Sequence, residues 1–111
     1  ILRKAPNMGW DLRQQGVGFG SLAATIFGRD VVVVNDMSAI AWGEHCLGVG
    51  QDTESMLCIS LGTGLGGAMI ADGHLWDGSG GVAVEIGHLK VRPGGRLCGC
   101  GARGCVEAYV G

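Results

Sequence analysis

Short apolar runs separated by clusters of glycine set the pattern of this chain. Segment 21–28, SLAATIFG, carries a capping Ser21 and ends in glycine, which predicts a short helix. Segment 31–34 is a run of four valines, typical of a strand that is buried on both faces. From 37 to 47 the apolar residues recur at near-helical spacing, which predicts a second helix that Gly48 ends.

The second half of the chain predicts paired strands. Its pattern gives, in order, a polar segment typical of a hinge at 48–55, a strand at 55–61, a glycine turn at 62–67, a returning strand at 68–71, a hairpin turn at Asp72-Gly73 and a strand-like piece at 88–91. The sequence has no internal repeat. Strands and helices in this order predict an α/β or α+β organisation.

Composition fits a folded protein and excludes some classes of function. Of the 111 residues, 47% are hydrophobic and 16% are charged, and the formal net charge is −2. This balance gives no support for binding nucleic acid or anionic membranes through bulk charge. No apolar run approaches the roughly 20 residues of a membrane span, and the N-terminus lacks the pattern of a signal peptide, so we expect a cytoplasmic protein. The two ends of the sequence indicate a fragment of a longer chain.

Three of the five cysteines crowd into the segment CGCGARGC, at Cys98, Cys100 and Cys105. An odd total without a secretion signal weakens a disulfide interpretation, although a disulfide or free thiols stay open. Thiolates in a glycine-rich loop favour zinc, which takes four ligands in a structural site. His88, ten residues before the first of these cysteines, completes a Cys3His set, and such a site would also fix the neighbouring carboxylates of Glu85 and Glu107.

Asp36 follows the predicted valine strand at the start of the predicted helix. An aspartate at that point is most often a helix cap, but it can also accept a proton from a substrate hydroxyl. The ends of buried strands are where open α/β sheets place ligands, which keeps a catalytic role open for this carboxylate.

Glycine makes up 23 of the 111 residues, about three times the usual share of roughly 7%. The segment GTGLGG matches G-x-G-x-x-G at Gly62, Gly64 and Gly67, but a strand follows it where a dinucleotide-binding motif needs a helix. Its backbone N–H groups and the hydroxyl of Thr63 suit an anion, and a plain glycine hairpin is an equal alternative.

Taken together, these motifs resemble the ROK family, which comprises sugar kinases and sugar-responsive repressors. GTGLGG looks like the second phosphate loop of that family, VEIGH resembles its GEIGH, and CGCGARGCVE is similar to its zinc signature C-x-C-G-x-x-G-C-x-E. The ND pair after the valines looks like the start of its NDAN motif. The resemblance runs from Asn7 to Gly111 and implies the two-lobed, actin/hexokinase-like (ribonuclease-H-like) α/β fold, of which this chain would be a central fragment.

The resemblance also implies roles for individual residues. Asp36 would be the general base that takes the proton from a sugar hydroxyl as that hydroxyl attacks the γ-phosphate of ATP. The sugar hydroxyls would be bound by Asn35, Asp36, Glu85, His88 and Glu107. The nucleotide phosphates would be cradled by Gly62, Thr63 and Gly64. A structural zinc ion would be held by His88, Cys98, Cys100 and Cys105, and Mg²⁺ would accompany the ATP.

The same resemblance implies a division into two lobes and a function for the whole protein. Residues 1–50 would end the N-terminal lobe, and residues 51–111 would begin the C-terminal lobe. The implied protein is a homodimeric kinase for a hexose or an N-acetylhexosamine, with no membrane partner. A sugar-sensing repressor, which would bind nucleic acid, is the alternative within the family, and a zinc-stapled interaction module is the alternative outside it.

The chain departs from the family pattern in its NDMS and VEIGH segments, and two of the family's parts are missing. Ser38 stands where NDAN has an amide, and Val84 stands where a small residue is usual. The first phosphate loop and the part that holds adenosine are absent from the sequence, so we expect the chain alone to be inactive as a kinase.

Overall fold

The structure is a computed structural model that describes residues 4–5, 10–11 and 18–111. The chain forms two compact units, Ile1–Val34 and Asn35–Gly111. The part of the family resemblance between Asn7 and residue 18 lies outside the described residues, apart from 10–11. The longest helix in the described part has 12 residues, well short of the roughly 20 that a bilayer crossing needs.

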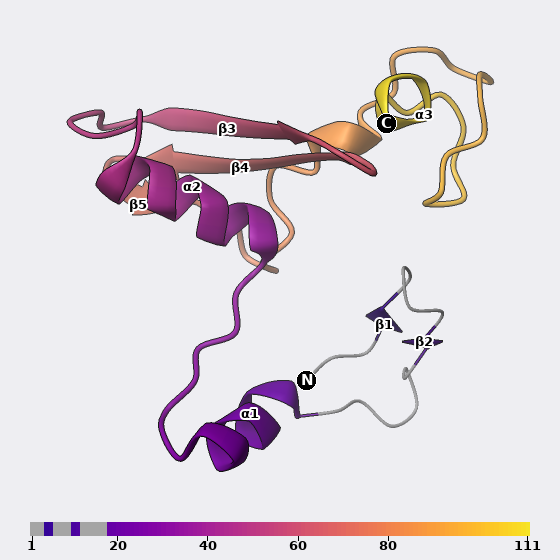
Figure 1. The fold of residues 1–111 in the computed structure, drawn as a ribbon. Helices are drawn as coiled ribbons and strands as arrows, with labels where there is room; N and C mark the ends of the chain where they lie inside the picture. Colours follow the sequence, from indigo (N-terminus) through magenta and orange to yellow (C-terminus); the bar gives the residue numbers. More distant parts are fainter. Residues whose placement is uncertain (1–3, 6–9, 12–17) are drawn as a thin grey trace. The chain divides into compact units, whose positions relative to one another are not determined.

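The first unit contains one helix and one short antiparallel strand pair among its described residues. These elements are β1 (Lys4–Ala5), β2 (Trp10–Asp11) and α1 (Phe19–Phe27) (Figure 1). The predicted helix is confirmed, and Gly28 ends it in the left-handed conformation with a φ of 64°. Ser21 is not its cap, because the helix begins two residues earlier and Ser21 lies inside it, where its carbonyl accepts a hydrogen bond from Thr25 Oγ1.

The predicted strand at 31–34 is wrong for the structure as described. The segment is extended chain without ladder pairing, and Val32 is 86% exposed. A strand needs a partner for its backbone N–H and C=O groups, and the described residues place no other strand beside this one. The β-branched run therefore has a high strand propensity, but propensity alone does not form a strand.

The second unit begins with helix α2 (Asp36–Leu47), and this prediction is confirmed together with its end at Gly48. The helix cap is Asn35, whose side-chain oxygen accepts hydrogen bonds from the backbone N–H groups of Met37 at 2.9 Å and Ser38 at 3.2 Å. Asp36 is consequently the first helical residue and not the cap. An acidic side chain in the first turn is also favourable to the helix dipole.

Three antiparallel strands follow, in the order β3 (Met56–Leu61), β4 (Leu65–Ala71) and β5 (His74–Leu75). The predicted hairpin is confirmed, with Met56 opposite Ile70 and Leu61 opposite Leu65. Asp72 and Gly73 form the turn between β4 and β5, with φ values of 50° and 71°. An Asp-Gly pair is favoured there because both central residues of such a turn need positive φ.

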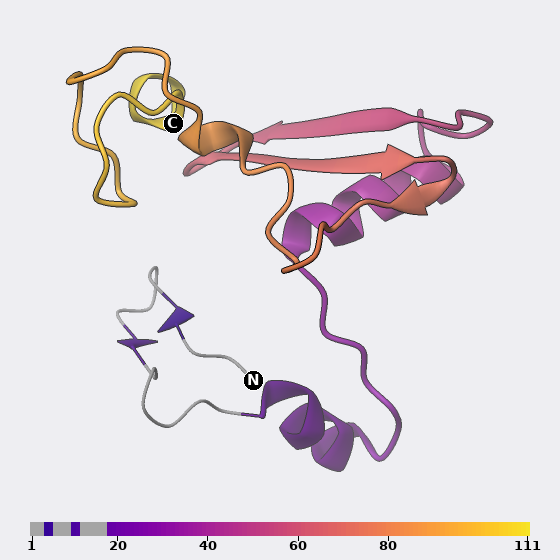
Figure 2. The same ribbon diagram turned by 180° about the vertical axis from the view of Figure 1, so that it is seen from behind.

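Helix α2 covers one face of this sheet (Figures 1 and 2). Met37 and Ala41 of the helix pack on Ala68 of β4, and Met56 and Cys58 of β3 join them because alternate residues of a strand point to the same face. The opposite face of β3 carries exposed apolar side chains, at Leu57, Ile59 and Leu61. The core of the unit therefore lies between α2 and the sheet.

Strand β4 begins at Leu65, three residues before the predicted start, because two glycines belong to the strand and not to the turn. A Cβ on Gly66 would lie 2.7 Å from the Cγ of Met37. A Cβ on Gly67 would lie 2.9 Å from the side chain of Ile86 and from the carbonyl of Val84. These glycines let α2 and the 84–87 segment approach the strand closely.

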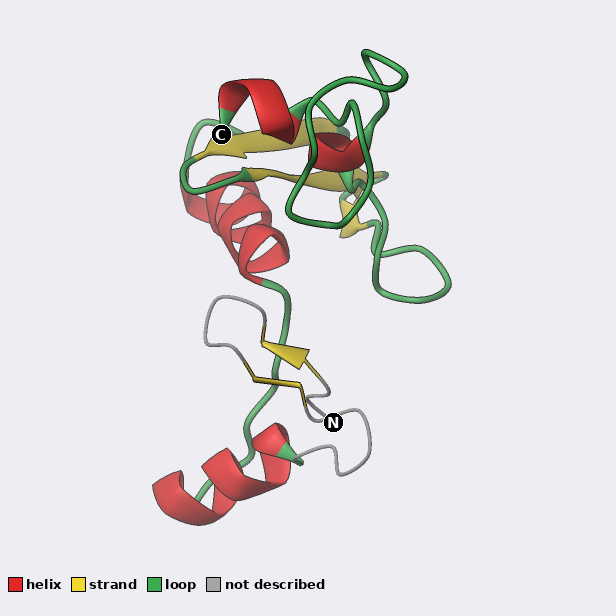
Figure 3. Cartoon of the chain, turned by 90° about the vertical axis from the view of Figure 1, so that its right-hand side faces the viewer, coloured by secondary structure: helices red, strands yellow, loops and turns green. Residues whose placement is uncertain are grey.

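The C-terminal part is mostly loop, with a short 3₁₀ helix, η2 (Ile86–His88), and a last turn of helix, α3 (Glu107–Val110) (Figure 3). The predicted strand at 88–91 is wrong: only a single bridge, between Lys90 and Cys105, forms there. The backbone groups of this segment form isolated hydrogen bonds with the loop around the cysteines, so no continuous ladder develops.

Packing around two glycines predicts stability changes of opposite sign. Gly43 lies in α2 with nothing within 4 Å of an added Cβ, so Gly43→Ala should raise the free energy of unfolding by about 0.5–1 kcal/mol. In Gly87→Ala the added methyl group would overlap the carbonyl oxygen of Leu65, so stability should fall. Urea unfolding followed by far-UV circular dichroism measures both. A loss in the first variant or no change in the second would contradict the described packing.

Candidate functional site

The N-terminus of α2 borders a small hollow of about 160 Å³ in the second unit. Asn35 and Asp36 line it from the helix, and Glu85 lines it from the loop before η2. The structure thus brings together three of the residues that the resemblance assigned to a sugar, although they come from segments about 50 positions apart. One oxygen of the Asp36 carboxylate, Oδ1, lies 2.9 Å from the backbone nitrogen of Met37.

Two further residues line this hollow that sequence reasoning missed, Trp76 and Asp77. The Oδ1 atom of Asp77 accepts a hydrogen bond of 3.0 Å from the hydroxyl of Ser38, which is 7% exposed. Ser38 stands where the family motif has an amide. In this chain the serine hydroxyl has its own hydrogen-bond partner, Asp77. Nothing in the local pattern distinguishes the Trp-Asp pair after β5 from ordinary turn residues, because tertiary contact alone brings it to α2.

The glycine turn at 62–64 lies next to Glu107, which follows the cysteine loop. Glu107 Oε2 accepts a hydrogen bond of 3.0 Å from the backbone N–H of Leu65. A Cβ on Gly64 would overlap that same carboxylate oxygen, so a side chain at this point would displace the Glu107 carboxylate. The turn is closed by the N–H of Gly62, which donates to the carbonyl of Gly64 at 2.9 Å. Glu107 therefore fixes the predicted phosphate turn to the cysteine loop.

His88, Cys98, Cys100 and Cys105 lie together, with one ligand atom of each within 4.8 Å of the others. The sulfur atoms of Cys100 and Cys105 are 3.8 Å apart, and Cys98 Sγ is 3.8 Å from His88 Nδ1. All five cysteines are free thiols in the structure. Two thiolates at about 2.3 Å from one tetrahedral zinc ion would lie about 3.8 Å apart, so these four residues fit a zinc ion.

Local backbone geometry makes this clustering possible. Gly101 and Gly104 have φ values of 87° and 80°, which glycine adopts freely. Cys98 donates its N–H to the carbonyl of Ala102 at 2.8 Å and accepts at its own carbonyl from Gly101 at 2.9 Å, which closes the tight turn around Cys100. Cys98 is 4% exposed and Cys105 is fully buried, so the loop itself supplies the cover for two of the sulfurs.

The thiols of this loop differ in their proton affinity. The backbone N–H of Cys100 lowers the pKa of Cys98, but burial and the neighbouring thiols of Cys100 and Cys105 outweigh it and raise this pKa to about 11. The backbone N–H of Ala102 and the thiol of Cys98 hold the pKa of Cys100 below its usual value. A hydrogen bond to Cys105 raises the pKa of Lys90. Cys100 is thus the thiol of the cluster whose pKa is lowered, and the charge of Lys90 contributes to that lowering.

The two ring nitrogens of His88 face different neighbours. Nδ1 faces the sulfur of Cys98, while Nε2 lies 3.9 Å from the carboxylate of Glu85, which is longer than a hydrogen bond. A carboxylate beside the second nitrogen is the usual environment of a metal-binding histidine. Glu85 consequently borders both the α2 hollow and the cysteine cluster, and it lies between the two halves of the predicted site.

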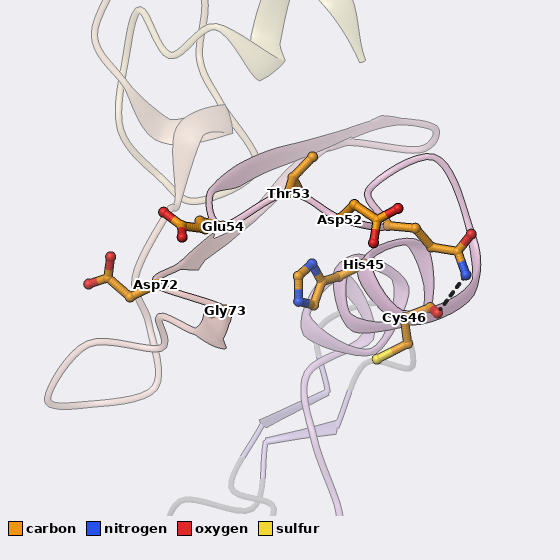
Figure 4. A pocket seen from close by; sticks show the side chains of 8 residues that line it. His45, Cys46, Asp52, Thr53, Glu54, Asp72 and Gly73 are labelled. Carbon is orange, nitrogen blue, oxygen red and sulfur yellow. Dashed lines mark hydrogen bonds between the residues drawn. The ribbon is translucent and has the colours of Figure 1, made fainter.

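A larger, open hollow of about 700 Å³ lies elsewhere in the second unit, at the far end of α2 (Figure 4). His45 and Cys46 line it from the helix, Asp52 to Glu54 from the polar segment predicted as a hinge, and Asp72 from the β4–β5 turn. The Nδ1 atom of His45 has no hydrogen-bond partner among the described residues. None of the residues predicted for the functional site lines this hollow.

Sequence comparison decides the family of the chain. The sequence model of the ROK family matches residues 2–111. The chain belongs to the ROK family. A glucokinase from Streptomyces coelicolor is 47% identical over 106 residues, which are 96% of this chain and 32% of that protein. An N-acetylmannosamine kinase from Salmonella arizonae is 45% identical over 87 residues, 78% of this chain and 29% of that protein. The chain spans about a third of the length of these curated relatives.

Solved structures of the family have the same fold. A ROK family glucokinase from Streptomyces griseus, in complex with glucose and AMPPNP, is 45% identical and superposes with a TM-score of 0.82 over 96% of this chain and 33% of its own. A ROK family transcriptional regulator, a homologue of the E. coli MLC protein, is 34% identical with a TM-score of 0.76 over 86% of this chain and 24% of its own. The expected actin/hexokinase-like α/β fold is confirmed, with this chain as one part of it.

Val84 departs from the GEIGH pattern at a point where the backbone favours glycine. Its φ is 63°, in the left-handed region, which is a genuine strain for a β-branched residue. Such a conformation costs on the order of 1–3 kcal/mol and persists only where the surroundings enforce it. The contacts of the 84–87 segment with β4 supply that enforcement.

Val84→Gly should therefore raise the free energy of unfolding by about 1 kcal/mol, because the strain relieved exceeds the entropy that glycine loses on folding. Val82→Gly is the matched control, since Val82 lies two residues away, is exposed and does not have a positive φ. The control should lower stability or leave it unchanged. Thermal unfolding of both variants measures the effect, and a loss of stability in Val84→Gly would contradict the assigned backbone conformation.

Proposed function

We propose that the protein to which this chain belongs is an ATP-dependent sugar kinase that acts on a hexose or an N-acetylhexosamine. The observation that carries the proposal is the hollow at the start of α2, where Asn35, Asp36 and Glu85 converge. Glucokinases and an N-acetylmannosamine kinase among the relatives support the same reaction class. A hollow lined by carboxylates and an amide suits a polyol, whose hydroxyl groups both donate and accept hydrogen bonds.

In the proposed mechanism Asp36 is the general base. Its carboxylate accepts the proton of one sugar hydroxyl while the oxygen of that hydroxyl forms a bond to the γ-phosphorus of ATP. The bond from that phosphorus to the bridging oxygen breaks, and ADP leaves with the electron pair. Phosphoryl transfer asks mainly for positioning and charge stabilisation, so fixing the hydroxyl in line with the phosphorus is the main task of the site.

Four neighbours of the base would orient the sugar. Asn35, Glu85, His88 and Glu107 are proposed to hydrogen-bond its remaining hydroxyls. The geometry supports Asn35 and Glu85 most directly, because both line the hollow of Asp36. Glu107 has one carboxylate oxygen engaged with Leu65, which leaves the other, Oε1, for the sugar or for the neighbouring thiol of Cys98 at 3.5 Å.

The turn at Gly62, Thr63 and Gly64 is proposed to bind the phosphates of ATP. Its backbone is free of side chains at two of three positions, so N–H groups can approach an anion closely. Mg²⁺, bound together with the ATP, would neutralise part of the phosphate charge. Because Glu107 joins this turn to the cysteine loop, the phosphate end and the sugar end of the site would keep a fixed separation.

Zinc is proposed to be structural. His88, Cys98, Cys100 and Cys105 would hold it, and it would shape the loop that carries Glu107 without taking part in phosphoryl transfer. The loop has little apolar core of its own, so a metal would supply much of its folding free energy.

The proposal extends to the organisation of the whole protein. Residues 1–50 would end the N-terminal lobe and residues 51–111 would begin the C-terminal lobe, with the polar segment 48–55 near the hinge. We also propose a homodimer, which follows from the family resemblance, and a cytoplasmic location. Size-exclusion chromatography with light scattering tests the first and cell fractionation the second.

A second candidate function is a sugar-sensing repressor, which one observation favours: the superposition on a ROK transcriptional regulator. Such a protein would keep the sugar residues and the zinc ligands but would not need the base. The presence of both Asp36 and the glycine turn favours the kinase. The repressor therefore stands second.

The base assignment predicts the outcome of one substitution. Asp36→Asn in the full-length protein should lower kcat about 10²–10⁴-fold, because the amide cannot accept the proton. ADP release from ATP, recorded across a panel of hexoses and N-acetylhexosamines, measures this. Asp52→Asn is the matched control, since it makes the same chemical change outside the hollow of Asp36.

Each outcome of that experiment separates the candidates. Sugar-dependent ADP release that the Asp36 variant loses and the Asp52 variant keeps supports the kinase and identifies its substrate. Retention of most turnover by Asp36→Asn contradicts the base assignment. Absence of turnover with any sugar in the unchanged protein, with sugar binding by calorimetry, favours the repressor.

The zinc assignment predicts a loss of metal on a single atom exchange. Cys100→Ser should lower zinc content from one ion per chain to a small fraction, because a serine hydroxyl is not ionised at neutral pH and binds zinc weakly. Cys46→Ser, an exposed cysteine outside the cluster, is the control and should keep its zinc. Elemental analysis of purified full-length protein measures both. Full occupancy in the Cys100 variant would show the ligand assignment to be wrong.

A further inference from the structure

With zinc bound as proposed, the cysteine cluster would carry a charge that the metal does not balance. Three thiolates outweigh the two positive charges of a zinc ion, so a Cys3His centre keeps one negative charge in excess. In the structure the ammonium of Lys90 lies 2.8 Å from the sulfur of Cys105, and this sulfur belongs to a fully buried residue. We propose that Lys90 is a positioning residue of the zinc centre, which supplies the compensating charge and holds the Cys105 thiolate. This inference rests on the proposed zinc site.

Backbone pairing explains why the lysine reaches this sulfur. Lys90 and Cys105 form an isolated antiparallel bridge. Hydrogen bonds flank the pair on both sides, from Val106 N–H to the Leu89 carbonyl at 3.0 Å and from Val91 N–H to the Gly104 carbonyl at 2.9 Å. Residues opposite each other between such flanking bonds form a non-hydrogen-bonded pair, in which the side chains come closest. The loop backbone therefore directs Lys90 onto Cys105.

Two other cations of the same loop are engaged elsewhere. The guanidinium of Arg96 lies over the ring of Tyr109, at 5.2 Å from its centroid. Arg103 donates to the carbonyl of Gly95 at 3.3 Å. Both side chains thus serve the packing of the loop, whereas the contact of Lys90 is with a candidate ligand.

The contact has two consequences for a bound metal. A hydrogen bond from a cation withdraws electron density from the sulfur, which stabilises the thiolate against protonation and against attack on electrophiles. It also fixes the direction of the sulfur lone pairs, and partners of this outer kind are worth about 10–100-fold in metal affinity. A lysine suits this role because its ammonium is a compact point charge for a single acceptor atom.

The test uses the full-length protein and three substitutions. Lys90→Met removes the charge and keeps the aliphatic stem, Lys90→Arg keeps the charge, and Arg103→Gln removes a cation from the same loop without touching a ligand. Zinc affinity is measured by competition with a chromogenic zinc chelator. Lys90→Met should bind zinc about 10–100-fold more weakly than the parent, Lys90→Arg should recover most of that loss, and Arg103→Gln should match the parent.

A spectroscopic readout separates this role from a general effect on folding. With Co²⁺ in place of zinc, loss of the hydrogen bond should move the thiolate-to-cobalt absorption of Lys90→Met to longer wavelength, because the sulfur electrons rise in energy. Far-UV circular dichroism of the metal-loaded forms checks that the fold is kept. Lys90→Gln, a second variant without the charge, replaces Lys90→Met where the latter does not fold.

The outcomes distinguish the proposed role of Lys90 from the proposed zinc site on which it rests. A parent protein that binds no zinc overturns the zinc site and the inference together. A parent that binds zinc, with Lys90→Met equal to it in affinity and cobalt spectrum, overturns the role of Lys90 alone. An equal loss in Arg103→Gln also overturns it, because the effect would then come from overall charge and not from the contact. Sugar kinase activity decides none of these outcomes.

Discussion

The close approach of three segments at the start of β4 is the constraint on which the rest of the second unit depends. Gly66 admits the side chain of Met37 from α2, and Gly67 admits Ile86 and the backbone of Val84. A side chain at either position would force Met37, Ile86 or the backbone of Val84 to shift. Because Asp36 directly precedes Met37 and Glu85 directly precedes Ile86, the two bare positions of the strand also determine how closely these carboxylates approach each other. The lack of side chains at Gly66 and Gly67 thus helps to set the geometry of the candidate site.

A second connection runs through Glu107. Its carboxylate lies between the backbone of Leu65, at the glycine turn, and the sulfur of Cys98. A rearrangement of the cysteine loop would therefore reach the turn through this carboxylate, in addition to the contacts that the 84–87 segment makes with β4. The same loop is held from the other side by the pairing of Lys90 with Cys105. The proposed metal ligands, the Glu107 carboxylate and the glycine turn are consequently connected by direct contacts.

Local chemistry made some of this architecture predictable. The α2 helix, the β3–β4 hairpin and the Cys3His grouping follow from spacing and from turn residues, which act over a few positions. The strand expected at 31–34 failed because a strand needs a partner that the local sequence does not contain. Asp77 was missed for the related reason that its contact with Ser38 spans 39 positions. The left-handed backbone of Val84 could not be predicted, because valine rarely adopts a positive φ.

Strand β3 has a further consequence for how the protein is made. Its segment MLCISL has no charge and no proline, and Leu57, Ile59 and Leu61 are exposed on the face away from α2. Segments of this kind, when uncovered at the edge of a sheet, are templates for cross-β association with other chains. Within the described residues β3 pairs on one edge only, with β4. Solubility during synthesis and purification therefore depends on how soon this strand is covered.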